Sequence, residues 1–150
     1  MESLHYLLMK THAVLSRRVA TAVHEIGLTS GQPKVLDFLS RHPEADQKTI
    51  AAHCEIEQTT VGSILTRMEK AGLVTRRRRA GDRRSRYVSL TREGHRAAEQ
   101  VEELFARVEA PVTRGLSAEE LEQLKTLLEK AYRAAQDPPR SEEGGGPRAH

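Results

Sequence analysis

The chain has 150 residues, of which 37% are hydrophobic and only 3% aromatic, and it contains no tryptophan. That length suffices for one domain with a core, or for a small head with a dimerisation element, and two independent domains are not expected. The core must come from Leu, Val, Ile and Ala along helices, which favours a mainly α-helical fold. The only cysteine, Cys54, excludes an intramolecular disulfide and a paired-cysteine metal knuckle.

The basic charge is concentrated in one short segment. The formal net charge is +3, but the stretch from residue 76 to residue 86 holds seven arginines against one acid, Asp82, so it carries +6 and the rest of the chain −3. Such a segment is typical of polyanion binding, although a solvated arginine run would look the same. The arginines are Arg76, Arg77, Arg78, Arg79, Arg83, Arg84 and Arg86.

No targeting or membrane segment is expected. The apolar run from Leu7 to Met9 is too short for a secretory signal, and Lys10 follows it at once. No segment approaches the length of a membrane span, and one unpaired cysteine fits a reducing cytoplasm. We therefore expect a cytoplasmic protein.

The first third of the sequence predicts two helices. Apolar residues recur at three- and four-residue steps from residue 4 to residue 26, where Gly27 closes a long amphipathic helix. Thr29 resembles an N-cap with Gln32 completing a capping box, so a second helix is predicted to run to about Ser40. His42 and Pro43 break it.

The middle of the chain predicts a helix-turn-helix followed by a hairpin. Asp46 is predicted to cap a short helix over 47–53, and after a turn at 54–56 a longer helix spans 58–71 and ends at Gly72. Two β-prone pieces, 73–78 and 86–90, then flank a turn at 80–82, and we call this hairpin the wing. The apolar stripe of the 58–71 helix is Val61, Ile64, Leu65 and Met68.

The last third predicts two more amphipathic helices and a tail. Thr91 caps the first, which Pro111 kinks or ends, and a capping box from Ser117 to Glu120 starts the second. The apolar stripes of both helices, like that of the first helix, are wider than a small head can cover, so a partner chain would bury them. Packing of the terminal helices on each other within one chain is the alternative. Residues 137–150 are predicted to be disordered.

The outward face of the 58–71 helix is suited to DNA. Opposite the apolar stripe lie small hydrogen-bonding side chains and cations, and no acid occurs between Glu57 and Glu69. A projecting helix fits the major groove, and arginines at a hairpin tip can enter an adjacent minor groove. A polar face alone would suit any surface helix, and the neighbouring arginine wing is what favours DNA contact.

The sequence resembles the MarR family of bacterial regulators. Three runs carry the resemblance: QKTIA at 47–51, QTTVGSILTRMEKAGLV at 58–74, and DRRSRYVSLTREG at 82–94. The resemblance implies an α+β winged helix-turn-helix with a head at about 29–91 and dimerisation helices at about 1–26 and 91–136, in one domain spanning 1–136. It also implies a homodimer that binds a palindromic operator, usually as a repressor, and that a small ligand or oxidation releases.

The DNA-contact residues expected from the helix, the wing and the resemblance are Gln58, Thr59, Thr60, Ser63, Arg67, Asp82, Arg83, Arg84 and Arg86. In the family, Gly62 and Ser63 are often replaced by Thr or Ser and then Arg, so a different operator preference is expected.

Other candidate sites are weak. His5 and His12 lie on one side of the first predicted helix and could border a ligand pocket or be surface groups. Cys54 occupies a position where a small apolar side chain normally packs, so redox sensing is not favoured. No catalytic constellation, phosphate loop, cofactor motif or metal-ligand spacing occurs, and no enzyme activity is expected.

Two other functional classes must be weighed. An architectural nucleic-acid-binding protein would use the basic hairpin alone and show little sequence preference, whereas a regulator should discriminate strongly between duplexes. A protein-interaction adaptor would not need an arginine-rich wing.

Overall fold

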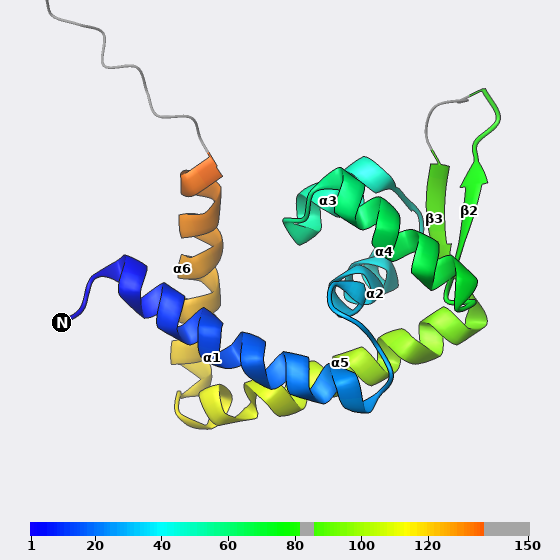
Figure 1. Ribbon diagram of the computed structural model, residues 1–150. Coiled ribbons are helices and arrows are strands. Elements are labelled where there is room, and N and C mark those ends of the chain that lie inside the picture. Colours follow the sequence, from blue (N-terminus) through cyan, green and yellow to red (C-terminus); the bar gives the residue numbers. More distant parts are fainter. Residues whose placement is uncertain (82–85, 137–150) are drawn as a thin grey trace, which may run out of the picture. The chain divides into compact units, whose positions relative to one another are not determined.

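The computed structural model describes residues 1–81 and 86–136, so the wing-tip residues 82–85 and the predicted tail 137–150 lie outside it. In chain order the elements are α1 (Leu4–Glu25), α2 (Gln32–Arg41), β1 (Ala45–Asp46), α3 (Gln47–Cys54), α4 (Gln58–Lys70), β2 (Val74–Arg78), β3 (Arg86–Leu90), α5 (Arg92–Arg114) and α6 (Ala118–Gln136). The predicted mainly helical fold with a small β-hairpin is confirmed (Figure 1). The chain divides into two compact units, 1–110 and 111–150.

The core of the first unit lies between α2, α3, α4, the sheet and the start of α5. Its fully buried side chains are aliphatic, as the composition predicts, and each contributes roughly 1.5–3 kcal/mol by leaving water. The helical stripe of α4 is buried throughout, and so are the inward residues of α3. The largest are Leu36, Leu39, Ile50, Leu65 and Met68.

A second apolar cluster joins α1 to α5 within the same unit. Val23 packs with Leu104 and Val108, and Leu15 and Val19 cover them from the middle of α1. The first half of α1 has no such cover, because Leu4, Leu7 and Leu8 are exposed. Only the second half of the predicted apolar stripe of α1 is therefore used within this unit.

The hairpin has a third strand that the sequence did not reveal. β1 pairs antiparallel with β3, and the strand order is β1-β3-β2. β1 is only two residues long, too short to show an alternating pattern. The predicted break at His42 and Pro43 leads into this extended segment, which ties the start of α3 to the wing.

Helix starts follow the predicted caps except in α2. The Asp46 carboxylate accepts a hydrogen bond from the Thr49 backbone N–H at 2.7 Å, Thr91 Oγ1 accepts one from Gly94, and Ser117 and Glu120 form both bonds of a capping box. The prediction that Thr29 is an N-cap was wrong. Gly31 takes that place in a left-handed conformation, and a Cβ there would lie 2.5 Å from Ile64 Cδ1. The Gln32 side chain does accept from the Thr29 N–H, at 3.1 Å, but within the turn that precedes α2.

Removal of the Asp46 cap is expected to destabilise the head at neutral pH. Hydrogen bonds from the hydroxyl and backbone N–H of Thr49 hold the pKa of the Asp46 carboxyl below its usual range. A lowered folded-state pKa adds stability above the usual carboxyl range, near pH ~4, which is lost as the pH falls through the lowered value. Asp46→Ala should cost about 1 kcal/mol in urea unfolding at pH 7. At pH ~3 the difference should shrink, whereas an equal difference at both pH values would exclude the charged cap.

For the C-terminal helices, the sequence predicts either a kink or a helix end at Pro111. Pro111 does not end α5, which continues to Arg114, although the division between the two units falls at this residue. In α6, residues 118–136 include no buried side chain. The predicted stripe along α6 is accordingly exposed at Leu124, Leu127 and Leu128.

Candidate nucleic-acid interface

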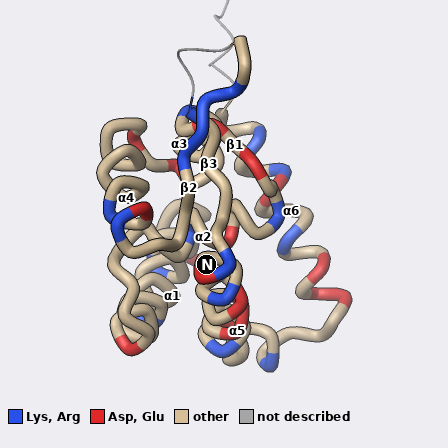
Figure 2. The backbone as a smooth tube through the Cα atoms, turned by 90° about the vertical axis from the view of Figure 1, so that its right-hand side faces the viewer, with Lys and Arg blue, Asp and Glu red and all other residues tan. Residues whose placement is uncertain are grey.

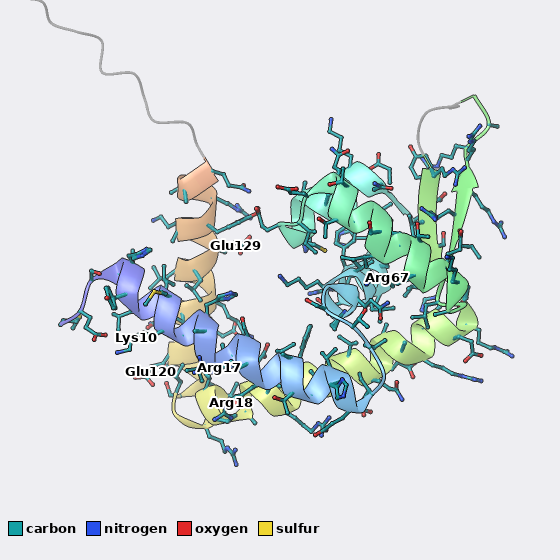
Figure 3. All side chains as sticks on the ribbon, in the orientation of Figure 1. Lys10, Arg17, Arg18, Arg67, Glu120 and Glu129 are labelled. Atoms are coloured by element: carbon teal, nitrogen blue, oxygen red, sulfur yellow. The ribbon has the colours of Figure 1, made fainter. Side chains whose placement is uncertain are left out.

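α4 presents a polar face because its apolar stripe is committed to the core. The stripe of Val61, Ile64, Leu65 and Met68 is buried, so the side chains on the opposite side of the helix point outward. All five predicted contact residues of this helix are exposed, and Figure 3 shows Arg67 on α4. They are Gln58, Thr59, Thr60, Ser63 and Arg67.

The hydroxyl groups on this face are partly engaged by the helix itself. Ser63 Oγ donates to the Thr59 carbonyl at 3.3 Å, and Thr66 Oγ1 donates to the Gly62 carbonyl at 2.9 Å. A hydroxyl that donates to the backbone keeps acceptor lone pairs. Ser63 is therefore suited to accept a hydrogen bond from an amino group of cytosine or adenine in the major groove.

Gln47, which is not among the predicted contact residues, shapes the same face. Its side-chain amide donates to the Gln58 carbonyl at 2.8 Å and joins the first turn of α3 to the first turn of α4. A Cβ at residue 62 would lie 3.0 Å from Gln47 Nε2, so glycine there lets the amide lie against α4. The hydrogen bond joins residues eleven positions apart, and no local pattern indicates it.

The wing carries its cations beside α4. Figure 1 shows β2 and β3 next to α4, extending away from the start of α5, and Figure 2 shows basic residues along β2. Arg78 and Arg86 are exposed and are direct cross-strand partners. Like charges placed opposite each other destabilise a hairpin, and a bound polyanion would relieve that repulsion.

Two other wing arginines have protein partners. Arg79 lies 4.1 Å from the centre of the Tyr87 ring and 3.2 Å from a Glu44 oxygen. The hydrogen bond to Glu44 raises the pKa of Arg79, so the guanidinium stays charged. Arg76 contacts α4 instead. Among the predicted wing residues, Arg86 is described, while Asp82, Arg83 and Arg84 lie outside the described residues.

A cavity of about 530 Å³ lies between α1, the loop before α2, and α5. Its wall is apolar at Leu15, Val19 and Phe105, and the imidazole rings of His12 and His24 and the ammonium group of Lys34 also line it. The volume is within the range of small-molecule sites. Of the two predicted ligand histidines, His12 lines this cavity and also contacts Ser16 Oγ, whereas His5 is an exposed residue that does not line it.

Comparison with known proteins identifies the family. Residues 26–85 match the model described as the MarR family. The chain is 34% identical over 133 residues to the homoprotocatechuate degradative operon repressor of Escherichia coli, an alignment that covers 86% of this chain and 87% of that protein. The chain belongs to the MarR family.

Solved structures agree with this MarR-family assignment. NadR in complex with 4-hydroxyphenylacetate is similar with a TM-score of 0.78 and 26% identity, over 91% of this chain and 96% of that one. MepR of S. aureus in complex with DNA gives a TM-score of 0.78 and 25% identity, over 89% of this chain and 99% of that one. The predicted winged helix-turn-helix fold class is confirmed.

Cys54 of this MarR-family chain is buried in the core of the head, as its position at the turn predicts. Burial raises the pKa of its thiol; the smaller effect of Lys34 lowers it, and that of Asp37 raises it further. A raised pKa reduces the thiolate fraction on which oxidation depends. The surroundings of Cys54 therefore favour a packing role.

Residues 1–81 and 86–136 contain neither a metal-binding cluster nor a membrane-spanning helix. No group of three or more His, Cys, Asp or Glu side chains there could hold a metal ion. No helix in the same range is long and apolar enough to cross a membrane.

Proposed function

We propose that this protein is a sequence-specific DNA-binding transcriptional repressor that acts as a homodimer. The observation that carries the proposal is the joint placement of the polar face of α4 and the basic strands of the wing on one side of the head. The relative from Escherichia coli is named a repressor, and the MepR structure contains DNA. A regulator with this role acts in the cytoplasm and needs no catalytic site.

The DNA contacts divide between two grooves. Gln58, Thr59, Thr60 and Ser63 lie toward the start of α4, the end that enters the major groove in helix-turn-helix proteins. Arg67 and Arg86 flank them and suit phosphates, and Arg83 and Arg84 are proposed for the adjacent minor groove, with Asp82 in support. Two heads would place these contacts about one helical turn, or ~10 base pairs, apart on a palindrome.

A second copy of the chain is the proposed cover for the terminal helices. The first half of α1 and one face of α6 each expose a row of large apolar side chains. Contiguous apolar faces of this kind mark protein interfaces, and a symmetric dimer would also supply the second head that a palindrome requires. We propose one functional domain spanning 1–136 on this basis.

The cavity in the first unit is the proposed effector site. An apolar wall, with the ammonium group of Lys34 and the imidazole rings of His12 and His24 around it, suits a small aromatic carboxylate. A ligand of this class is present in a similar structure, since the NadR structure holds 4-hydroxyphenylacetate. Because α1, α2 and α5 all line the cavity, a ligand there can alter the placement of the head and release DNA.

Loss of the Lys34 charge should weaken binding of the effector. With 4-hydroxyphenylacetate as the probe, Lys34→Met is expected to raise the dissociation constant about tenfold in calorimetry, because a charge-assisted contact is lost. Lys48→Met removes the same charge at an exposed position of α3 and should leave the dissociation constant unchanged. Equal affinity in Lys34→Met and wild-type protein would remove Lys34 from the site.

Selection of bound fragments from a random DNA pool tests the proposed function. We expect a palindrome with half-sites about ten base pairs apart. Failure to enrich any sequence, with retained salt-sensitive binding, would favour the architectural alternative.

A further inference from the structure

Arg76 differs from the other described arginines of the basic segment because its side chain is nearly covered. Its side chain is 13% exposed, against 57% for Arg79, which lies three residues further along. In β2 it lies on the same face as Val74, which is buried, and its cross-strand partner is the buried Val88. The Arg76 side chain therefore extends the packed seam between the wing and α4.

The Arg76 guanidinium is bonded to two side chains of α4. Its Nε lies 3.3 Å from Glu69 Oε2, and its Nη2 lies 3.4 Å from Glu69 Oε1 and 3.2 Å from Thr66 Oγ1. Thr66 and Glu69 are one helical turn apart on the exposed side of the helix. A planar guanidinium that holds two carboxylate oxygens and a hydroxyl has its orientation fixed.

These bonds also commit groups that would otherwise be available to DNA. Thr66 Oγ1 accepts from Arg76 and donates to the Gly62 carbonyl, so its hydroxyl is engaged on both sides. The hydrogen bond from Arg76 is the main cause of a lowered pKa at Glu69, and the charge of Arg86 adds to it. A carboxylate thus stays ionised on the proposed DNA-binding side, where it would repel phosphates.

We infer that Arg76 is a positioning residue, one that sets the wing at a fixed angle to α4 and makes no phosphate contact itself. This inference rests on the proposed function. The duplex links the major-groove contacts of α4 to the minor-groove contacts of the wing, and two linked contacts add in affinity only when both can be made together. If the wing were released from α4, each contact residue would remain, but the α4 contacts and the wing contacts could no longer be made together.

The decisive comparison uses Arg76→Gln, Glu69→Gln and the double variant on the selected palindrome. Each single variant should weaken binding about tenfold, and the double variant should be no weaker than either one, because one coupled pair is broken in all three. The slope of log affinity against log salt should not change. Glu69→Gln gives the sharpest contrast, since removal of a negative charge near DNA would tighten binding if the pair had no positioning role.

A phosphate-contacting Arg76 predicts a different pattern. Arg76→Gln would then lower the salt slope by about 0.9, as loss of one phosphate contact does, and Glu69→Gln would bind as tightly as wild type or tighter. Arg77→Gln is the matched control, because Arg77 is an exposed neighbour in β2. The charge-reversed pair Arg76→Glu with Glu69→Arg should recover part of the affinity lost in Arg76→Glu alone.

The outcomes separate this inference from the proposed function. Wild-type protein that does not distinguish the palindrome from a scrambled duplex would overturn the proposed function. Wild-type protein that does distinguish them, together with a lowered slope in Arg76→Gln and no loss in Glu69→Gln, would overturn the positioning role alone. Circular dichroism and urea unfolding of each variant check that the fold is kept, as expected because neither residue belongs to the hydrophobic core.

Discussion

Gly94→Ala should destabilise the protein by about 3 kcal/mol or more, although alanine favours helix by roughly 1 kcal/mol. Gly94 is buried in the first turn of α5, and a Cβ there would lie 2.0 Å from the Leu73 carbonyl oxygen and 3.1 Å from Leu90 Cδ2. The carbonyl belongs to the backbone, so it cannot rotate away as a side chain would, and it also accepts the Thr91 N–H at 3.0 Å. α5 would have to move away from the start of β2.

Urea unfolding at a fixed protein concentration measures this effect, since a dimer couples stability to concentration. Gly115→Ala is the matched control, because a Cβ there would make only ordinary contacts at 3.5 Å. A midpoint for Gly94→Ala equal to that of wild type would show that α5 and β2 are not so closely packed.

Leu127→Glu should dissociate the homodimer and reduce affinity for the palindrome by about 100-fold or more, because a single head loses the linked second contact. Leu127 is the most exposed of the large apolar residues of α6, at 62%. A carboxylate there would be buried without a partner in the proposed interface, at a cost of several kcal/mol. The variant protomer itself should still fold, since α6 buries no residue in its own chain.

Analytical ultracentrifugation should give a mass twice the 16.8 kDa of the chain for wild type and a single-chain mass for Leu127→Glu. Thr126→Glu adds the same charge to the neighbouring position, away from the apolar row, and should remain dimeric. If Leu127→Glu still dimerises as strongly as wild type, this face of α6 does not belong to the interface.

Local signals in the sequence predicted the helices and much of the proposed interface. Side-chain caps at Asp46, Thr91 and Ser117 and the apolar stripe of α4 depend on residues a few positions apart, so periodicity and capping rules suffice. The outward face of α4 follows from the same stripe. The tendency of α2 to start at a side-chain cap was overridden at Gly31, where close packing on Ile64 and a left-handed backbone decide the conformation.

Features that depend on distant contacts were not predictable. The β1 strand exists through its pairing with β3, and the Gln47 contact with α4 depends on the angle between two helices. Arg76 was counted with the other arginines of the basic segment, because a charge run gives no sign of which members find carboxylates after folding. The cavity likewise gathers residues from α1, α2 and α5.

The ratio of affinities for the selected palindrome and a scrambled duplex of equal length tests the central claim most directly. At physiological salt, two correctly spaced heads that read bases should give a ratio of about 10³ or more. A ratio near one, with binding that depends only on salt, would contradict sequence-specific recognition by α4 and the wing.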